Sequence, residues 1–150
     1  MSEEPLSQLG HIVSLQLCVG HREPMKSVGS VQVLTGVGIK GDRHAVADGI
    51  RVKRQVLLMD QETLTSFRLT QGDLRENITI RDFDLYKTQE GQRIALGEEV
   101  VLSITGHCAP CARMDEIRQG LRTKLDRKRG MLSYVEQGGM LHVGDPVTLL

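Results

Sequence analysis

Short apolar segments, separated by glycine and polar turn residues, recur along most of the chain. They are rich in Val, Ile and Leu and too short for typical helices, so they predict strands. The expected strands are residues 11–18, 28–34, 54–59, 77–80, 92–96, 100–105, 131–136 and 146–149. Residues 97–99, which begin with a glycine, predict a hairpin between two of these strands. The pattern favours a mainly β fold, an antiparallel barrel-like sheet or sandwich, with a few helices.

One longer segment, after Cys111, has the periodicity of a helix. Its apolar positions are Met114, Ile117, Leu121 and Leu125. Their spacings of three and four, with charged residues between them, predict one amphipathic helix that Gly130 ends. The basic residues 127–129 then complement the dipole in its last turn, with an anion site as the alternative. A shorter helix is expected over 60–68, with Asp60 as its N-cap.

Composition and charge exclude several classes of protein. The 150 residues, 39% hydrophobic and 25% charged, are enough for a single domain, 1–150, with one core. Nineteen basic and nineteen acidic residues cancel, so the chain lacks the general positive charge that binds nucleic acid or anionic membranes. Aromatic residues are 3% with no Trp, so few rings are available to stack on bases. We therefore expect no nucleic-acid or membrane partner.

The cellular location follows from the chain start and the cysteines. No apolar run approaches the ~20 residues of a membrane helix. Glu3 and Glu4 lie where a signal peptide would carry positive charge. Three cysteines are an odd number and too few for a disulfide framework. We expect a cytoplasmic protein whose thiols are reduced.

The sharpest local feature is the segment 107–113, His-Cys-Ala-Pro-Cys-Ala-Arg, between an expected strand and the expected helix. Pro110 has no amide proton to leave unpaired, so it suits a helix start and fixes the approach of Cys111. The unpaired amides at the helix start, with Arg113 nearby, favour the thiolate form of Cys111. A thiolate is the form that binds soft metals or attacks an electrophile.

Three other interpretations of Cys108 and Cys111 compete with this one. A Cys-x-x-Cys redox pair is expected near a βαβ unit, which the short strands do not suggest. Structural zinc needs four closed ligands, and no second cysteine pair or histidine pair completes the set. Two buried thiols without a chemical task remain an alternative, because free cysteine is often simply part of a core.

A glycine-punctuated loop, residues 36–44, is the second candidate. Glycines let backbone amides approach an anion, and Lys40, Arg43 and His44 would add charge-assisted donors for a phosphate or carboxylate. A turn in which Asp42 caps the bend is an equally good interpretation. Arg54 and Asn77 each start an expected strand. Arg54 is either a pocket residue or part of a solvated strand edge. Asn77 is either a pocket residue or the cap of its strand.

Together these segments resemble the MOSC domain, the module named for the C-terminal part of molybdenum cofactor sulfurases. The resemblance rests on five blocks in the family's order, residues 38–44, 54–58, 76–78, 110–111 and 138–147. It implies a strand-rich, barrel-like fold in which Cys111 binds the molybdenum of a pterin cofactor through sulfur. The residues that it implies for holding the cofactor are Lys40, Gly41, Asp42, Arg43, His44, Arg54, Asn77 and Arg113, beside Cys111.

The leading functional hypothesis is a molybdenum-dependent oxidoreductase that reduces N-hydroxylated compounds such as hydroxylaminopurines or amidoximes. His44 or His107 would supply protons near neutral pH. A separate electron-donating reductase is implied, because the chain has no flavin fingerprint or iron–sulfur cysteine set. Pyridoxal phosphate is not expected, since the aminotransferase-like part of the sulfurases is absent. The alternative is a carrier of molybdenum cofactor or of cysteine-bound sulfur that passes its cargo to a partner.

Cys108 adds a second thiol beside the family's ligand. We hypothesise that it protects Cys111 through a reversible disulfide or takes a persulfide. An oxidant should then lower the free-thiol count of the Cys18→Ser protein, and an unchanged count would contradict the hypothesis.

Overall fold

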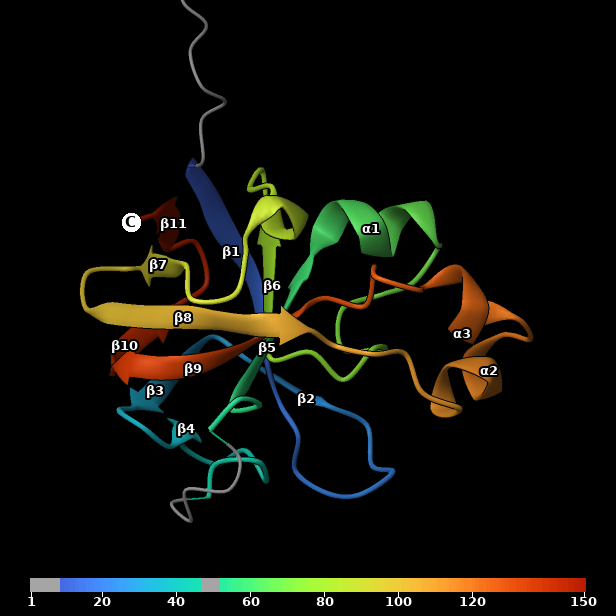
Figure 1. The fold of residues 1–150 in the computed structure, drawn as a ribbon. Coiled ribbons are helices and arrows are strands. Elements are labelled where there is room, and N and C mark those ends of the chain that lie inside the picture. The colour runs from blue at the N-terminus through green and yellow to red at the C-terminus, as the bar shows by residue number, and fades with distance from the viewer. Residues whose placement is uncertain (1–8, 47–51) are drawn as a thin grey trace, which may run out of the picture.

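The computed structural model describes residues 9–46 and 52–150, and within them seven strands close into a barrel (Figure 1). Hydrogen bonds run around the ring in the order β1–β11–β7–β8–β9–β5–β6 and return to β1. The strands are β1 (Leu9–Leu17), β5 (Val56–Asp60), β6 (Ile78–Arg81), β7 (Arg93–Leu96), β8 (Val100–His107), β9 (Met131–Gln137) and β11 (Pro146–Leu149). The expected mainly β, barrel-like fold is confirmed.

One pair of neighbouring barrel strands is parallel, a feature that the expected antiparallel sheet did not include. β5 and β6 run in the same direction, with Leu58 beside Ile78. The chain between them passes through helix α1 (Gln61–Ser66) and returns to the end of the barrel at which β5 begins, as a parallel connection requires. The other barrel pairs are antiparallel, including the hairpin of β7 and β8, in which Leu96 faces Val100.

Four short strands surround the barrel. β2 (Lys26–Val28) extends the sheet beside β1, and a second sheet has the order β10–β3–β4. Its strands are β3 (Ser30–Leu34), β4 (Gly38–Ile39) and β10 (Gly139–His142). The expected strand 28–34 is therefore two strands, broken at Gly29, and β4 and β10 were not expected.

The helices confirm one prediction and correct another. Asp60 is the N-cap of α1, where its carboxylate accepts a hydrogen bond from the Thr63 amide at 3.0 Å. The single helix expected after Cys111 is wrong. Instead a turn over 118–120 separates α2 (Arg113–Ile117) from α3 (Leu121–Lys124), and its last residue, Gly120, has a left-handed φ of 85° that favours glycine. A 3-10 turn, η1 (Leu85–Lys87), precedes β7.

Two apolar clusters stabilise these elements. Val, Ile and Leu side chains of the strands fill the barrel, and a second cluster lies under the helices, which share one side of the barrel (Figure 1). The second cluster contains Met114, Leu121 and Leu125, as the periodicity predicts, whereas Ile117 is 42% exposed. None of the helices that the structure describes is both long and apolar enough to cross a membrane.

Candidate functional site

A pocket of about 330 Å³ opens where the ends of several barrel strands meet the loops that lead to the helices. Its polar and sulfur-bearing lining residues are Cys18, His21, Arg43, His44, Arg54, Arg75, Asn77, Cys108, Cys111, Arg113 and Arg129. Leu57 and Leu132, which pack against Cys108, add an apolar wall. Segments that are far apart in the sequence thus meet at one cavity.

The structure brings together most of the site residues expected from the sequence. Six of them line the pocket: Arg43, His44, Arg54, Asn77, Cys111 and Arg113. Lys40, Gly41 and Asp42 do not line it; Lys40 is exposed, while Asp42 is buried behind the pocket wall. His107 lies at a different cavity.

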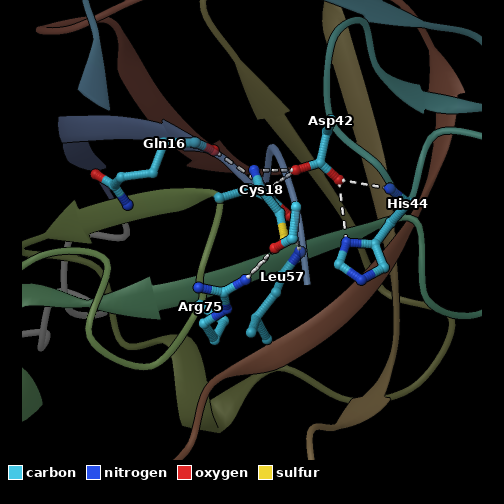
Figure 2. A network of polar contacts seen from close by, with 8 residues as sticks. Gln16, Cys18, Asp42, His44, Leu57 and Arg75 are labelled. Carbon is cyan, nitrogen blue, oxygen red and sulfur yellow. Dashed lines mark hydrogen bonds and ion pairs between the residues drawn. The ribbon is translucent and has the colours of Figure 1, made fainter. Parts of the chain in front are cut away.

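Asp42 organises the wall of the pocket through four hydrogen bonds, as Figure 2 shows for Cys18 and His44. One carboxylate oxygen accepts from the Cys18 amide at 2.6 Å and from Asn77 Nδ2 at 3.0 Å. The other lies 3.0 Å from the His44 amide and 3.2 Å from His44 Nδ1. Because a carboxylate only accepts, Nδ1 of His44 carries a proton and Nε2 is the atom left for proton exchange.

The charge of Asp42 is stabilised by these donors. Burial on its own raises the pKa of a carboxyl group, but the hydrogen bonds from the His44 ring and from the Cys18 and His44 amides outweigh it, so the pKa of Asp42 lies below its ordinary value. The buried group is therefore a carboxylate at neutral pH.

The backbone of the glycine loop does not form the anion cradle that was one of its two interpretations. The Lys40, Asp42 and Arg43 amides donate to carbonyls of other residues, and the His44 amide donates to Asp42. The alternative, a bend capped by Asp42, is what the structure shows. The donors that this loop offers an anion at the pocket are therefore the side chains of Arg43 and His44.

Cys111 lies half-buried on the pocket wall beside Arg129, a cation of the basic run 127–129. The guanidinium of Arg129 is 3.9 Å from Cys111 Sγ, and it donates to the carbonyls of Ala109 and Leu74, each at 3.1 Å. Residues 127–129 follow α3 rather than ending a long helix, and Arg127 has a left-handed φ of 60°. The basic run is therefore not a helix terminus, and Arg129 belongs to the site.

Arg129 is buried without an acidic partner. It is 8% exposed, its Nε has no hydrogen-bond partner, and no carboxylate of residues 9–46 and 52–150 forms an ion pair with it. A buried cation is costly unless an anion neutralises it. This side chain therefore indicates an anionic ligand in the pocket.

Cys18 and Arg75 form a second sulfur–guanidinium contact, which strand and helix patterns did not predict. Arg75 Nη2 donates to Cys18 Sγ at 3.1 Å and to the Gly20 carbonyl at 2.9 Å (Figure 2). Buried Glu76 holds the segment 72–75, which carries Arg75, by accepting hydrogen bonds from the Gly72 and Leu74 amides. Burial raises the pKa of the Glu76 carboxyl group.

His107 is separate from this pocket. Its ring stacks on Tyr86 with centroids 6.1 Å apart, and its Nε2 is 3.2 Å from Arg127. Burial and the nearby Arg127 charge lower the pKa of His107. Of the two histidines proposed as proton donors, His44 is the one at the pocket.

The lining defines the class of site. Five arginines, two histidines and three free thiols line the cavity, and no carboxylate is among its lining residues in the part of the chain that the structure describes. Such a pocket suits an anion that also carries a thiol-seeking atom. The fold and site are thus those of a barrel protein with a cysteine-containing anion pocket.

Sequence comparison identifies the family. The family model for the MOSC domain matches residues 43–148, so the chain belongs to the MOSC domain family. The matched range begins in the glycine loop and ends in β11, which covers most of the pocket residues. No curated protein matches the sequence.

Solved structures share the fold over nearly the whole chain. The YuaD protein from Bacillus subtilis has a TM-score of 0.79 at 19% identity, over 94% of this chain and 95% of that one. YiiM from Geobacillus stearothermophilus has a TM-score of 0.74 at 15% identity, over 94% and 75% of the two chains. YiiM from Escherichia coli has a TM-score of 0.69 at 15% identity, over 93% and 69%.

Proposed function

We propose that this protein binds molybdenum cofactor through Cys111 and reduces N-hydroxylated compounds. The observation that carries the proposal is the half-buried Cys111 sulfur beside Arg129, a buried cation without an acidic partner. Membership of the MOSC domain family supports the assignment of the cofactor. The proposal joins a soft ligand and an anion site in one cavity.

The residues present fit the chemistry of this cofactor. A thiolate is a suitable ligand for a soft metal, and Cys111 presents its sulfur on the pocket wall. The cofactor's phosphate needs charge-assisted donors, which Arg43, Arg54 and Arg113 supply at the same cavity. When bound, the metal centre supplies two-electron redox chemistry.

The protein's own residues would bind the substrate's polar group and deliver protons. In the overall reaction the N–O bond breaks, two electrons and two protons are consumed, and the oxygen leaves as water. A separate electron-donating reductase would supply the electrons. His44 is a suitable proton donor at Nε2, because Asp42 fixes its Nδ1 side.

A carrier of cofactor or of cysteine-bound sulfur is the second candidate, since Cys111 would serve it equally. The two functions differ in turnover. With cofactor and a chemical reductant, an enzyme consumes an amidoxime catalytically, whereas a carrier only exchanges its cargo with a partner.

Cys111 is the proposed ligand of the metal. In a host that makes molybdenum cofactor, Cys111→Ser should lower the molybdenum content of the purified protein by about tenfold or more, because loss of a ligand exceeds the effect of losing an outer-shell partner. Elemental analysis measures this directly. Cys108→Ser is the matched control, since Cys108 lines the same pocket, and it should keep its metal. Equal metal in the wild-type and Cys111→Ser proteins would refute Cys111 as the ligand.

A further inference from the structure

The segment that carries Arg129, residues 127–130, lies between α3 and β9 and belongs to neither. Arg127 and Gly130 both have a left-handed φ, of 60° and 96°. A Cβ at Gly130 would collide with the carbonyl oxygen of Leu58, so the backbone passes close to the barrel strand β5 here. The direction in which the Arg129 side chain leaves this irregular segment therefore depends on the contacts that the backbone makes on either side of it.

The hydroxyl group of Tyr86 makes such contacts on both sides of Arg129. It donates a hydrogen bond to the Lys128 carbonyl at 2.9 Å and accepts one from the Gly130 amide at 3.1 Å. Tyr86 lies in η1 and lines the cavity of His107 rather than the pocket. One hydroxyl group thus fixes the carbonyl before Arg129 and the amide after it, from outside the pocket.

Tyr86 is itself held in place. Its ring stacks on His107, and the carbonyl of Gly130 accepts a hydrogen bond from the Cys108 amide at 3.0 Å, which ties the segment to the loop that leads to the pocket cysteine. Burial and the negative charge of Asp60 raise the pKa of the Tyr86 hydroxyl, so this group keeps its proton and remains a donor at neutral pH.

We infer that Tyr86 is a positioning residue for anion binding, because its hydroxyl directs the guanidinium of Arg129 toward Cys111 and the pocket. The inference rests on the anion site of the proposed function, since Tyr86 itself lies outside the pocket. Without the hydroxyl, the Lys128 carbonyl and the Gly130 amide lose their shared partner, and the segment is free to turn the guanidinium away from the sulfur.

Tyr86→Phe removes the hydroxyl and keeps the ring. Titration of inorganic phosphate into the purified full-length protein, followed by NMR, should show an affinity weaker by about threefold to tenfold, the effect of losing one ordinary hydrogen bond. Tyr134→Phe is the matched control, because Tyr134 is the other tyrosine of the chain, lies on β9 and is not among the described residues that line the pocket. It should bind phosphate as the wild-type protein does.

A double variant separates positioning from a general loosening of the fold. If Tyr86 acts through Arg129, Tyr86→Phe should cost no further phosphate affinity in a protein that already carries Arg129→Gln. An equal fold-loss in both backgrounds would overturn the inference. So would a folded Tyr86→Phe protein that binds phosphate as the wild type does.

Alkylation of Cys111 gives a second readout that needs no phosphate. Iodoacetate is an anion and iodoacetamide is neutral, and both alkylate a thiolate with loss of iodide. The ratio of their rates at Cys111 reports the positive charge beside the sulfur, whereas a change in exposure affects both rates alike. Mass spectrometry of the Cys111 peptide should show a ratio that falls in Tyr86→Phe toward its value in Arg129→Gln. A ratio equal to that of the wild type would contradict the positioning role.

These measurements distinguish this inference from the proposed function. If the wild-type protein binds phosphate no better than Arg129→Gln does, the anion site of the proposed function is wrong and the role of Tyr86 falls with it. If Arg129→Gln weakens phosphate binding but Tyr86→Phe does not, the anion site stands and only the role of Tyr86 is wrong.

Discussion

Replacing Asp42 with alanine is expected to lower the free energy of unfolding by about 3 kcal/mol, because buried donors would lose a charged acceptor. The Cys18 amide and Asn77 Nδ2 both donate to one oxygen of Asp42, and the His44 amide donates to the other. Asp42 itself is 5% exposed, so water does not readily replace it. Urea denaturation followed by circular dichroism measures the loss.

Comparing the wild-type protein with Asp42→Asn at several pH values shows how the charge of Asp42 contributes to the free energy of unfolding. Because the pKa of Asp42 in the folded protein lies below its ordinary value of about 4, its charge stabilises the fold above that pH. The contribution is lost as the pH falls below about 4 and the folded protein takes up the proton. The difference in free energy of unfolding between the wild-type protein and Asp42→Asn should therefore decrease at acidic pH. If this difference is small at neutral pH, or stays constant down to pH 3, the carboxylate does not have the role assigned to it.

Local patterns predicted the strands better than their pairing. Alternating or continuous apolar residues identify a strand within a few residues, as for β5 and β6. Whether such strands run parallel depends on where the connecting chain returns, and α1 with the loop after it decides this through tertiary packing. Spacing also predicted that Met114, Leu121 and Leu125 are buried. It could not show that a turn ending at Gly120 divides the helix in two while these three side chains stay buried.

The candidate site was predictable where its residues are neighbours in the sequence. Cys111 and Arg113 share one motif, and Arg43 and His44 share another. Arg75 was missed, and Arg129 was covered only by the anion site that was the alternative for residues 127–129, because an arginine in a polar stretch or a basic run usually has the sequence context of a solvated residue. Only the fold reveals that both guanidinium groups turn inward to sulfur atoms.

The glycine loop illustrates a different limit. Its sequence was equally compatible with an anion cradle and with a capped bend, because both use glycine and backbone amides. Partners distant in sequence decide between them. The Lys40 amide donates to the Gln32 carbonyl and the Arg43 amide to the Cys18 carbonyl, so contacts with distant segments occupy these two donors.

Arg129→Gln is expected to weaken the pocket's affinity for phosphate by about tenfold or more, since a charge-assisted hydrogen bond in a buried site contributes about 1.5–3 kcal/mol. The substitution removes a buried cation that no described carboxylate neutralises, so the pocket loses attraction for an anion. Titration of inorganic phosphate followed by NMR measures the change. Arg122→Gln is the matched control, because Arg122 is exposed on α3 and does not line the pocket.

Arg129 also supports the walls of the pocket, so its charge and its packing must be separated. Its guanidinium donates to the Ala109 and Leu74 carbonyls, and its loss also costs stability. Arg129→Lys keeps the positive charge but loses the planar guanidinium and its several donors. It should therefore bind phosphate better than Arg129→Gln does, while leaving the Ala109 and Leu74 carbonyls poorly hydrogen-bonded. Unfolding curves for both variants show that each is folded under the titration conditions. A folded Arg129→Gln protein that binds phosphate as the wild type does would refute the role of Arg129 in anion binding, and with it the main electrostatic support for a phosphate-bearing cofactor at Cys111.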